Sequence, residues 1–83
     1  MRLNERMLSE VVGEPRVVIK GREEALIERH RGLLAYDPRC VRARCGAYEV
    51  RVDGESLTIP FFGLEDMIVA GKIASVSFLE CAP

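Results

Sequence analysis

Apolar and charged residues alternate between Cys40 and Ile59, which is the clearest periodic pattern in the chain. Side chains of a β-strand point to opposite faces with period two, so this alternation predicts strands with one buried face. Two turn dipeptides, Cys45-Gly46 and Asp53-Gly54, divide the segment, and Asp-Gly between alternating strands is a strong hairpin signal. We therefore expect a three-stranded antiparallel meander across residues 40–59.

The two turns also predict the register of this meander. A two-residue turn at Cys45-Gly46 pairs Arg42 with Glu49, which predicts a cross-strand ion pair. A turn at Asp53-Gly54 pairs Val50 with Leu57. Both turns place one apolar set on the same face, which we expect to be buried: Val41, Ala43, Tyr48, Val50, Leu57 and Ile59. Both place a polar set on the opposite face, which we expect to point outward: Arg42, Arg44, Glu49, Arg51, Ser56 and Thr58.

Short strands are also expected on both sides of the meander. Residues 16–20, 24–29 and 32–36 have strand-like length and composition and are separated by glycines. Residues 61–66 are expected to be a loop, and residues 67–70 and 73–78 a last hairpin across residues 70–72, with a β-bulge near Ala74. The pattern predicts an all-β fold, a small antiparallel meander forming a sandwich or roll, with a β-solenoid as the alternative.

Length and apolar spacing suggest one domain with an N-terminal extension. Residues 1–14 are expected to form an arm or short helix, and residues 15–83 a single β domain. A chain of 83 residues is marginally stable alone, so we expect burial against a protein partner or in a homo-oligomer. No apolar run is long enough for a signal peptide or a membrane span, which predicts a cytoplasmic protein.

The net charge of −1 argues against a nucleic-acid-binding protein, since such domains usually carry a strong basic excess. The outward face of the meander nevertheless carries Arg42, Arg44 and Arg51, which are candidate contact residues. No aromatic residue is expected on that face to stack on a base. A small nucleic-acid-binding β-barrel using this arginine face is therefore the alternative function rather than the leading one.

No pattern of residues specifies catalysis, a metal site or a cofactor. His30 is the single histidine, and no nucleophile or orienting group is placed with it by spacing, so we expect a turn residue. The three cysteines lack the spacing of a zinc site or a disulfide framework, and we expect free thiols. His30, Arg31, Phe61 and Phe62 are further candidate partner contacts, because adjacent aromatics in a loop are difficult for a small domain to bury together.

Four motifs carry a family resemblance. In chain order they are PRVVIKG at 15–21, LIERHRGLL at 26–34, VRVDGESLTI at 50–59, and MIVAGKI at 67–73 followed by Val76 and Phe78. In this order and spacing, over residues 13–78, the chain resembles the YabP/YqfC family of sporulation proteins from endospore-forming bacteria, and its short N-terminal segment is more similar to the YqfC branch. The family often has Asn where this chain has Arg29.

The resemblance implies a non-enzymatic protein made in the mother cell and needed for morphogenesis of the spore envelope (coat or cortex). Members are typically encoded beside a membrane protein of sporulation, which implies a membrane-bound partner. The resemblance thus implies a cytoplasmic protein recruited to the forespore membrane or coat. It carries over no catalytic residue and no cofactor.

Overall fold

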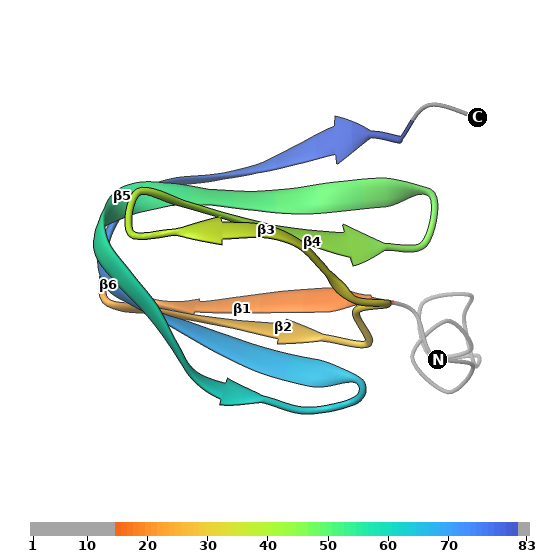
Figure 1. Ribbon diagram of the computed structural model, residues 1–83, viewed down its shortest axis with the longest axis horizontal. Helices are drawn as coiled ribbons and strands as arrows, with labels where there is room; N and C mark the ends of the chain where they lie inside the picture. Colours follow the sequence, from red (N-terminus) through yellow and green to blue (C-terminus); the bar gives the residue numbers. More distant parts are fainter. Residues whose placement is uncertain (1–14, 82–83) are drawn as a thin grey trace, which may run out of the picture.

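The computed structural model describes residues 15–81, which form six β-strands in one antiparallel sheet (Figure 1). The strands are β1 (Arg16–Lys20), β2 (Glu24–Glu28), β3 (Leu33–Asp37), β4 (Cys40–Cys45), β5 (Tyr48–Phe62) and β6 (Asp66–Glu80). Their order across the sheet is β1-β2-β6-β5-β4-β3. The predicted all-β antiparallel fold is confirmed, and the arm or helix predicted for residues 1–14 lies outside the described residues.

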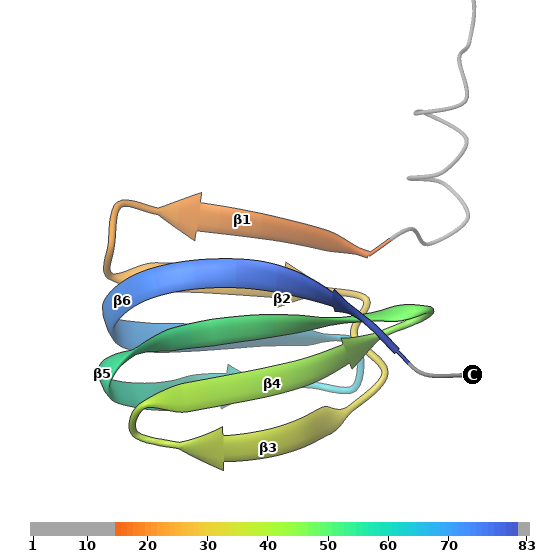
Figure 2. The same ribbon diagram turned by 90° about the horizontal axis from the view of Figure 1, so that it is seen from above.

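The sheet bends back on itself because the two long strands, β5 and β6, run through both of its halves (Figures 1 and 2). Residues 48–53 of β5 pair with β4 and with residues 75–80 of β6, which forms the β3–β4 layer. Residues 66–70 of β6 pair with β2 and with residues 58–62 of β5, which forms the β1–β2 layer. The two layers stack face to face, as a sandwich or roll does.

The core lies between these two layers and follows the period-two pattern of the strands. Its members are apolar residues from β2, β4, β5 and β6: Ala25, Ile27, Val41, Ala43, Cys45, Val50, Val52, Leu57, Met67, Val69 and Ile73. Tyr48 and Ile59 are partly buried against this cluster, so the predicted inward face of residues 41–59 is confirmed. Burying aliphatic side chains from both layers joins the two halves of the bent sheet.

Two glycines allow β5 and β6 to cross closely at the bend. A Cβ atom on Gly54 would collide with the carbonyl oxygen of Lys72 and lie 2.9 Å from its carbonyl carbon. A Cβ atom on Gly71 would lie 2.6 Å from the carbonyl oxygen of Ser56, and Gly71 also has a φ of +139°. These neighbours are backbone atoms, so any larger residue would force the two strands apart.

The turns of the two outer hairpins hold this bend in place. The β3–β4 turn accepts hydrogen bonds from β5, and the β1–β2 turn accepts hydrogen bonds from β6. The four bonds are Gly54 N–H to Arg39 O (3.0 Å), Leu57 N–H to Pro38 O (2.9 Å), Gly71 N–H to Glu23 O (3.1 Å) and Ile73 N–H to Arg22 O (2.8 Å). The backbone groups on the outer sides of the bend are therefore bonded, although neither β4 nor β2 pairs with it.

Two predicted turns are wrong. The dipeptide Asp53-Gly54 lies inside β5, and Gly54 lacks the positive φ that a two-residue Asp-Gly turn requires. Residues 70–72 lie inside β6 instead of closing a last hairpin. The turn that joins β5 to β6 spans residues 63–65, so Phe61 and Phe62 end a strand and do not form a loop. Gly54 and Gly71 allow the two strands to approach closely at the bend. From sequence alone, a glycine with this role looks the same as a glycine in a tight turn.

The first turn forms one residue later than predicted. Cys45 pairs with Tyr48 across the turn Gly46-Ala47, so Cys45 is a buried residue of β4 and not a turn residue. Arg42 consequently lies opposite Arg51. Each residue of β4 thus pairs two positions further along β5 than predicted, and a shift of two keeps every side chain on its predicted face. The predicted bulge near Ala74 is confirmed, since Ser75 pairs with Asp53 while residue 73 pairs with residue 54.

Candidate partner-binding surfaces

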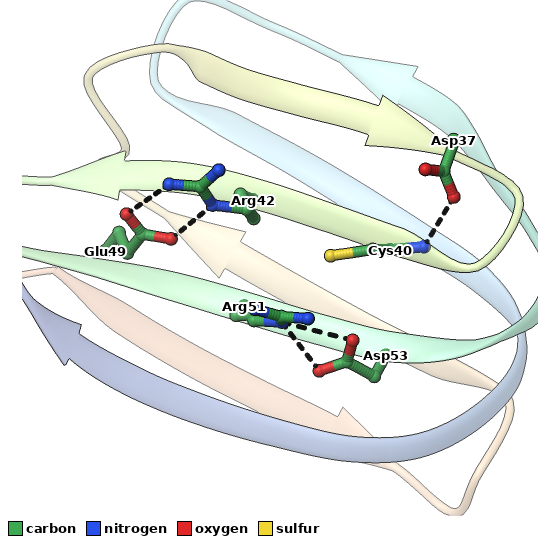
Figure 3. Close-up of polar contacts among 6 residues, drawn as sticks. All are labelled: Asp37, Cys40, Arg42, Glu49, Arg51 and Asp53. Carbon is green, nitrogen blue, oxygen red and sulfur yellow. Dashed lines mark hydrogen bonds and ion pairs between the residues drawn. The ribbon is translucent and has the colours of Figure 1, made fainter.

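The outer face of the β3–β4 layer carries the predicted arginines, and two of them, Arg42 and Arg51, bond to carboxylates on the same face (Figure 3). Arg42 donates from Nε and Nη2 to the two carboxylate oxygens of Glu49, at 2.6 and 3.0 Å. Arg51 donates from Nε to both oxygens of Asp53, each at 3.1 Å. Arg44 donates from Nε to the carbonyl of Gly46 at 3.2 Å. Two of the three arginines are therefore neutralised by carboxylates, and the face does not present a cluster of free cations to a polyanion.

The ion pair between Arg42 and Glu49 is confirmed, but it reaches diagonally across the two strands. In the observed register Glu49 lies opposite Arg44, and the long arginine side chain spans the offset. Glu49 is only 7% exposed, and hydrogen bonds from Arg42 hold the pKa of its carboxyl below the ordinary value of 4.5 although burial opposes this. The bidentate contact offsets the repulsion between Arg42 and Arg51, which lie directly opposite each other.

The lowered pKa of Glu49 predicts a contribution to acid stability. As the pH falls below about 4.5, the unfolded chain binds a proton at Glu49 before the folded chain does, so the folded state loses this stabilisation. Denaturant midpoints should therefore fall more steeply below pH 4.5 in the wild type than in Glu49→Gln. Urea unfolding between about pH 3 and 7 measures the difference. Parallel curves for the two proteins would contradict this expectation.

His30 lies in the loop between β2 and β3 and is buried. Its side chain is 4% exposed and joins the β2–β3 loop to the β5–β6 turn. Nδ1 accepts a hydrogen bond from the N–H of Gly32 at 3.0 Å, so Nε2 carries the proton and donates to the carbonyl of Gly63 at 3.1 Å. The ring of Phe62 stacks on the imidazole, with centroids 5.1 Å apart. Both ring nitrogens are used, which leaves no lone pair or proton for catalysis.

The neighbours of His30 differ in their exposure to solvent. The side chain of Arg31 is exposed, while its backbone N–H donates to the carbonyl of Arg44 at 2.7 Å. Arg29 adopts a φ of +62°, a left-handed conformation in which Asn is enriched relative to most residues. Of this loop, only the exposed side chain of Arg31 remains a candidate contact.

Phe61 completes an apolar row on the outer face of the β1–β2 layer. Val18 pairs with Leu26, Leu26 pairs with Ile68, and Ile68 pairs with Phe61, so one residue from each of four neighbouring strands contributes. Phe61 is 52% exposed, and the other three are partly exposed. We call these four residues the apolar row. An outward row of this kind is typical of a surface that contacts another protein.

Charged pairs flank the apolar row on both sides. Arg16 bonds to Glu28 at 2.7 Å on one side, and Lys20 lies 3.6 Å from Glu24 on the other. These pairs occupy the next outward-facing positions of β1 and β2. Such a polar rim around an apolar strip is the usual anatomy of a protein–protein interface.

The sequence does contain a pattern that indicates the apolar row, but the period-two alternation does not include it. Residues 17–19, 26–27 and 67–69 are consecutive apolar residues, whereas a strand with one wet face alternates. Consecutive apolar residues place an apolar side chain on each face. Phe61 and Phe62 are both about half exposed, so neither ring is buried in the core.

Within residues 15–81, no group of three or more His, Cys, Asp or Glu side chains could hold a metal ion. The same residues include no helix long and apolar enough to cross a membrane. A model of the YabP family matches residues 12–82 of the chain. Comparison with curated proteins and with solved structures found no match.

Proposed function

The chain belongs to the YabP family, and on this premise we propose that it is a non-enzymatic protein of spore envelope (coat or cortex) morphogenesis that acts through protein–protein contacts. Membership of the family suggests a role in sporulation. The proposed partner is a membrane-bound sporulation protein encoded nearby. The proposed location is the mother-cell cytoplasm, with recruitment to the forespore membrane or coat.

The apolar row is the observation that supports a contact role most strongly. It crosses four strands on one outer face and is flanked by ion pairs, while on the outer face of the other layer Arg42 and Arg51 are bonded to carboxylates. A partner suited to this surface would offer an apolar strip with polar residues on both sides. Contact residues in the centre of such a strip usually carry most of the binding energy.

Deletion of the gene in its host tests the biological role. We expect fewer heat-resistant spores and a defective coat or cortex on imaging, with vegetative growth unchanged. Normal numbers of heat-resistant spores with an intact envelope would refute the proposed role.

Phe61→Ser tests the contact surface. The ring is half exposed, so we expect a stability loss of no more than about 1 kcal/mol but loss of the two-hybrid signal with the neighbouring membrane protein. Leu64→Ser is the matched control, because Leu64 is an almost fully exposed apolar residue in the adjacent turn, outside the row. If Phe61→Ser and Leu64→Ser gave equal two-hybrid signals, the partner contact would lie outside the apolar row.

The alternative of nucleic-acid binding has weaker support. Arg42 and Arg51 are already bonded to carboxylates on their own face, and a polyanion would have to displace these contacts. Salt-dependent binding to single-stranded oligonucleotides, lost in the double variant Arg42→Glu with Arg44→Glu, would favour it over the leading proposal.

A further inference from the structure

The bent sheet leaves four strand edges unpaired within the described residues, and three of them carry features that discourage an added strand. The β1 edge is short and has Arg16 and Lys20. The edge formed by residues 58–62 of β5 contains Pro60, which donates no ladder hydrogen bond. The β3 edge has a register irregularity between Leu33 and Ala35. Charge, proline and irregular pairing are the features by which sheets avoid edge-to-edge association.

The fourth edge, formed by residues 75–80 of β6, has no proline and no register irregularity, and its single charged residue, Glu80, lies at its end. Figure 1 shows this part of β6 at the margin of the β3–β4 layer. It pairs in unbroken register with β5, and β2 reaches only as far as Ala70, so its other side has no strand partner among residues 15–81. The segment, SVSFLE, is uncharged until Glu80, and Phe78 is 61% exposed. We call residues 75–80 the β6 edge.

The backbone of the β6 edge has a defined orientation. The N–H of Cys81 donates to the carbonyl of Ala47 at 3.1 Å, on the β5 side. Residues of an antiparallel strand bond alternately to one side and to the other. The odd-numbered residues therefore bond to β5, and Val76, Phe78 and Glu80 direct their N–H and C=O groups away from it.

We propose that the β6 edge pairs antiparallel with the β6 edge of a second copy of this chain. A twofold arrangement sets even-numbered residues opposite even-numbered residues, so the outward N–H and C=O groups of each copy meet those of the other. The β3–β4 layer then continues as one sheet through both copies. A second copy fits this edge because the outward N–H and C=O groups of one copy complement those of the other. The uncharged side chains of residues 75–79 also cause no charge repulsion between the copies.

Alignment of side chains supports the same arrangement. Registers centred on Ser77 or on Phe78 both keep inward-facing residues on one face across the junction. The first sets Phe78 beside Val76 of the other copy, and the second sets the two Phe78 rings together. Either register would cover the ring of Phe78, which is mostly exposed in the single chain. Tyr48 contacts this ring edge-on, with centroids 5.6 Å apart.

The mass of the full chain in solution tests the dimer. We expect twice the chain mass of 9.3 kDa at high concentration, by sedimentation equilibrium. Phe78→Pro removes an outward N–H from each copy, so the dimer would lose two symmetric hydrogen bonds. Phe78→Ala keeps this N–H. We therefore expect Phe78→Pro to raise the dissociation constant of the dimer about 30-fold more than Phe78→Ala does. A monomer at every concentration, or a dimer equally tight in Phe78→Pro and Phe78→Ala, would overturn the proposal.

Two further measurements keep the test decisive if Phe78→Pro folds poorly. Ser77→Lys leaves the ladder to β5 intact and should also give monomers, because it sets like charges near the junction. In the wild type, amide exchange of residues 76 and 78 should slow as concentration rises. Protection of these amides in a monomer would assign the edge to another part of this chain, and unprotected amides in a dimer would place the interface elsewhere. Phe61→Ser should remain dimeric, which separates this proposal from the proposed partner contact.

Discussion

Gly54→Ala is expected to destabilise the protein by about 3 kcal/mol, because the added methyl group has no space at the crossing of β5 and β6. The nearest atoms are the carbonyl group of Lys72 and, at 3.1 Å, the Cα of Ile73, and backbone atoms cannot rotate away as a flexible side chain can. Relief requires the strands to separate, which would weaken the core beneath the bend. Urea unfolding followed by circular dichroism measures the loss.

Gly46→Ala is the control for this prediction. Gly46 has a φ of +70°, but a Cβ atom there meets nothing within 4 Å. Its substitution should cost only about 1 kcal/mol, the price of a left-handed alanine. Gly54 lacks a positive φ, so the two variants separate steric collision from backbone strain. If Gly46→Ala proves the more damaging of the two, close approach at the bend is not what selects glycine at position 54.

His30→Ala is expected to cost about 3 kcal/mol, because it leaves the N–H of Gly32 and the carbonyl of Gly63 without their partner and removes the ring beneath Phe62. The loss should be visible in thermal or urea unfolding of the purified protein, with no partner present. Near-wild-type stability in this variant would show that the imidazole is retained for another purpose.

Arg31→Ala provides the matched control beside it. The side chain of Arg31 is exposed, and the hydrogen bond made by its backbone N–H survives the substitution. We expect a change within about 0.5 kcal/mol, as for most surface positions. In sporulation assays the two variants should then have different causes for any defect. His30→Ala should lower spore formation by reducing the amount of folded protein. Arg31→Ala should lower it only if the Arg31 guanidinium contacts a partner.

The sequence predicts the faces of the strands better than the connections between them. The period-two pattern of residues 41–59 identified the buried side chains, because alternation is a local property of an extended chain. The pairing of β5 with β6 depends on where the chain reverses, and Gly54 and Gly71 resemble turn glycines although each serves a close crossing. Residue type alone does not distinguish these two uses.

The candidate surfaces were predicted only in part for the same reason. Phe61 was identified as a contact candidate from its neighbour Phe62, but its companions in the apolar row come from three other strands. The partners of His30 lie at Gly32, which is close in sequence, and at Gly63, which is not. The second contact depends on the β5–β6 turn reaching the β2–β3 loop, and no local pattern encodes this.

The sheet order has a consequence for how the chain reaches its fold. Four of its five ladders join strands that are consecutive in the chain, and only the ladder between β2 and β6 pairs distant segments, residues 24–28 with residues 66–70. The loop-closure entropy of folding is thus concentrated in one step, because the other ladders can form as local hairpins. The same ladder sets Leu26 against Ile68, so the apolar row is complete only once this long-range pairing has formed.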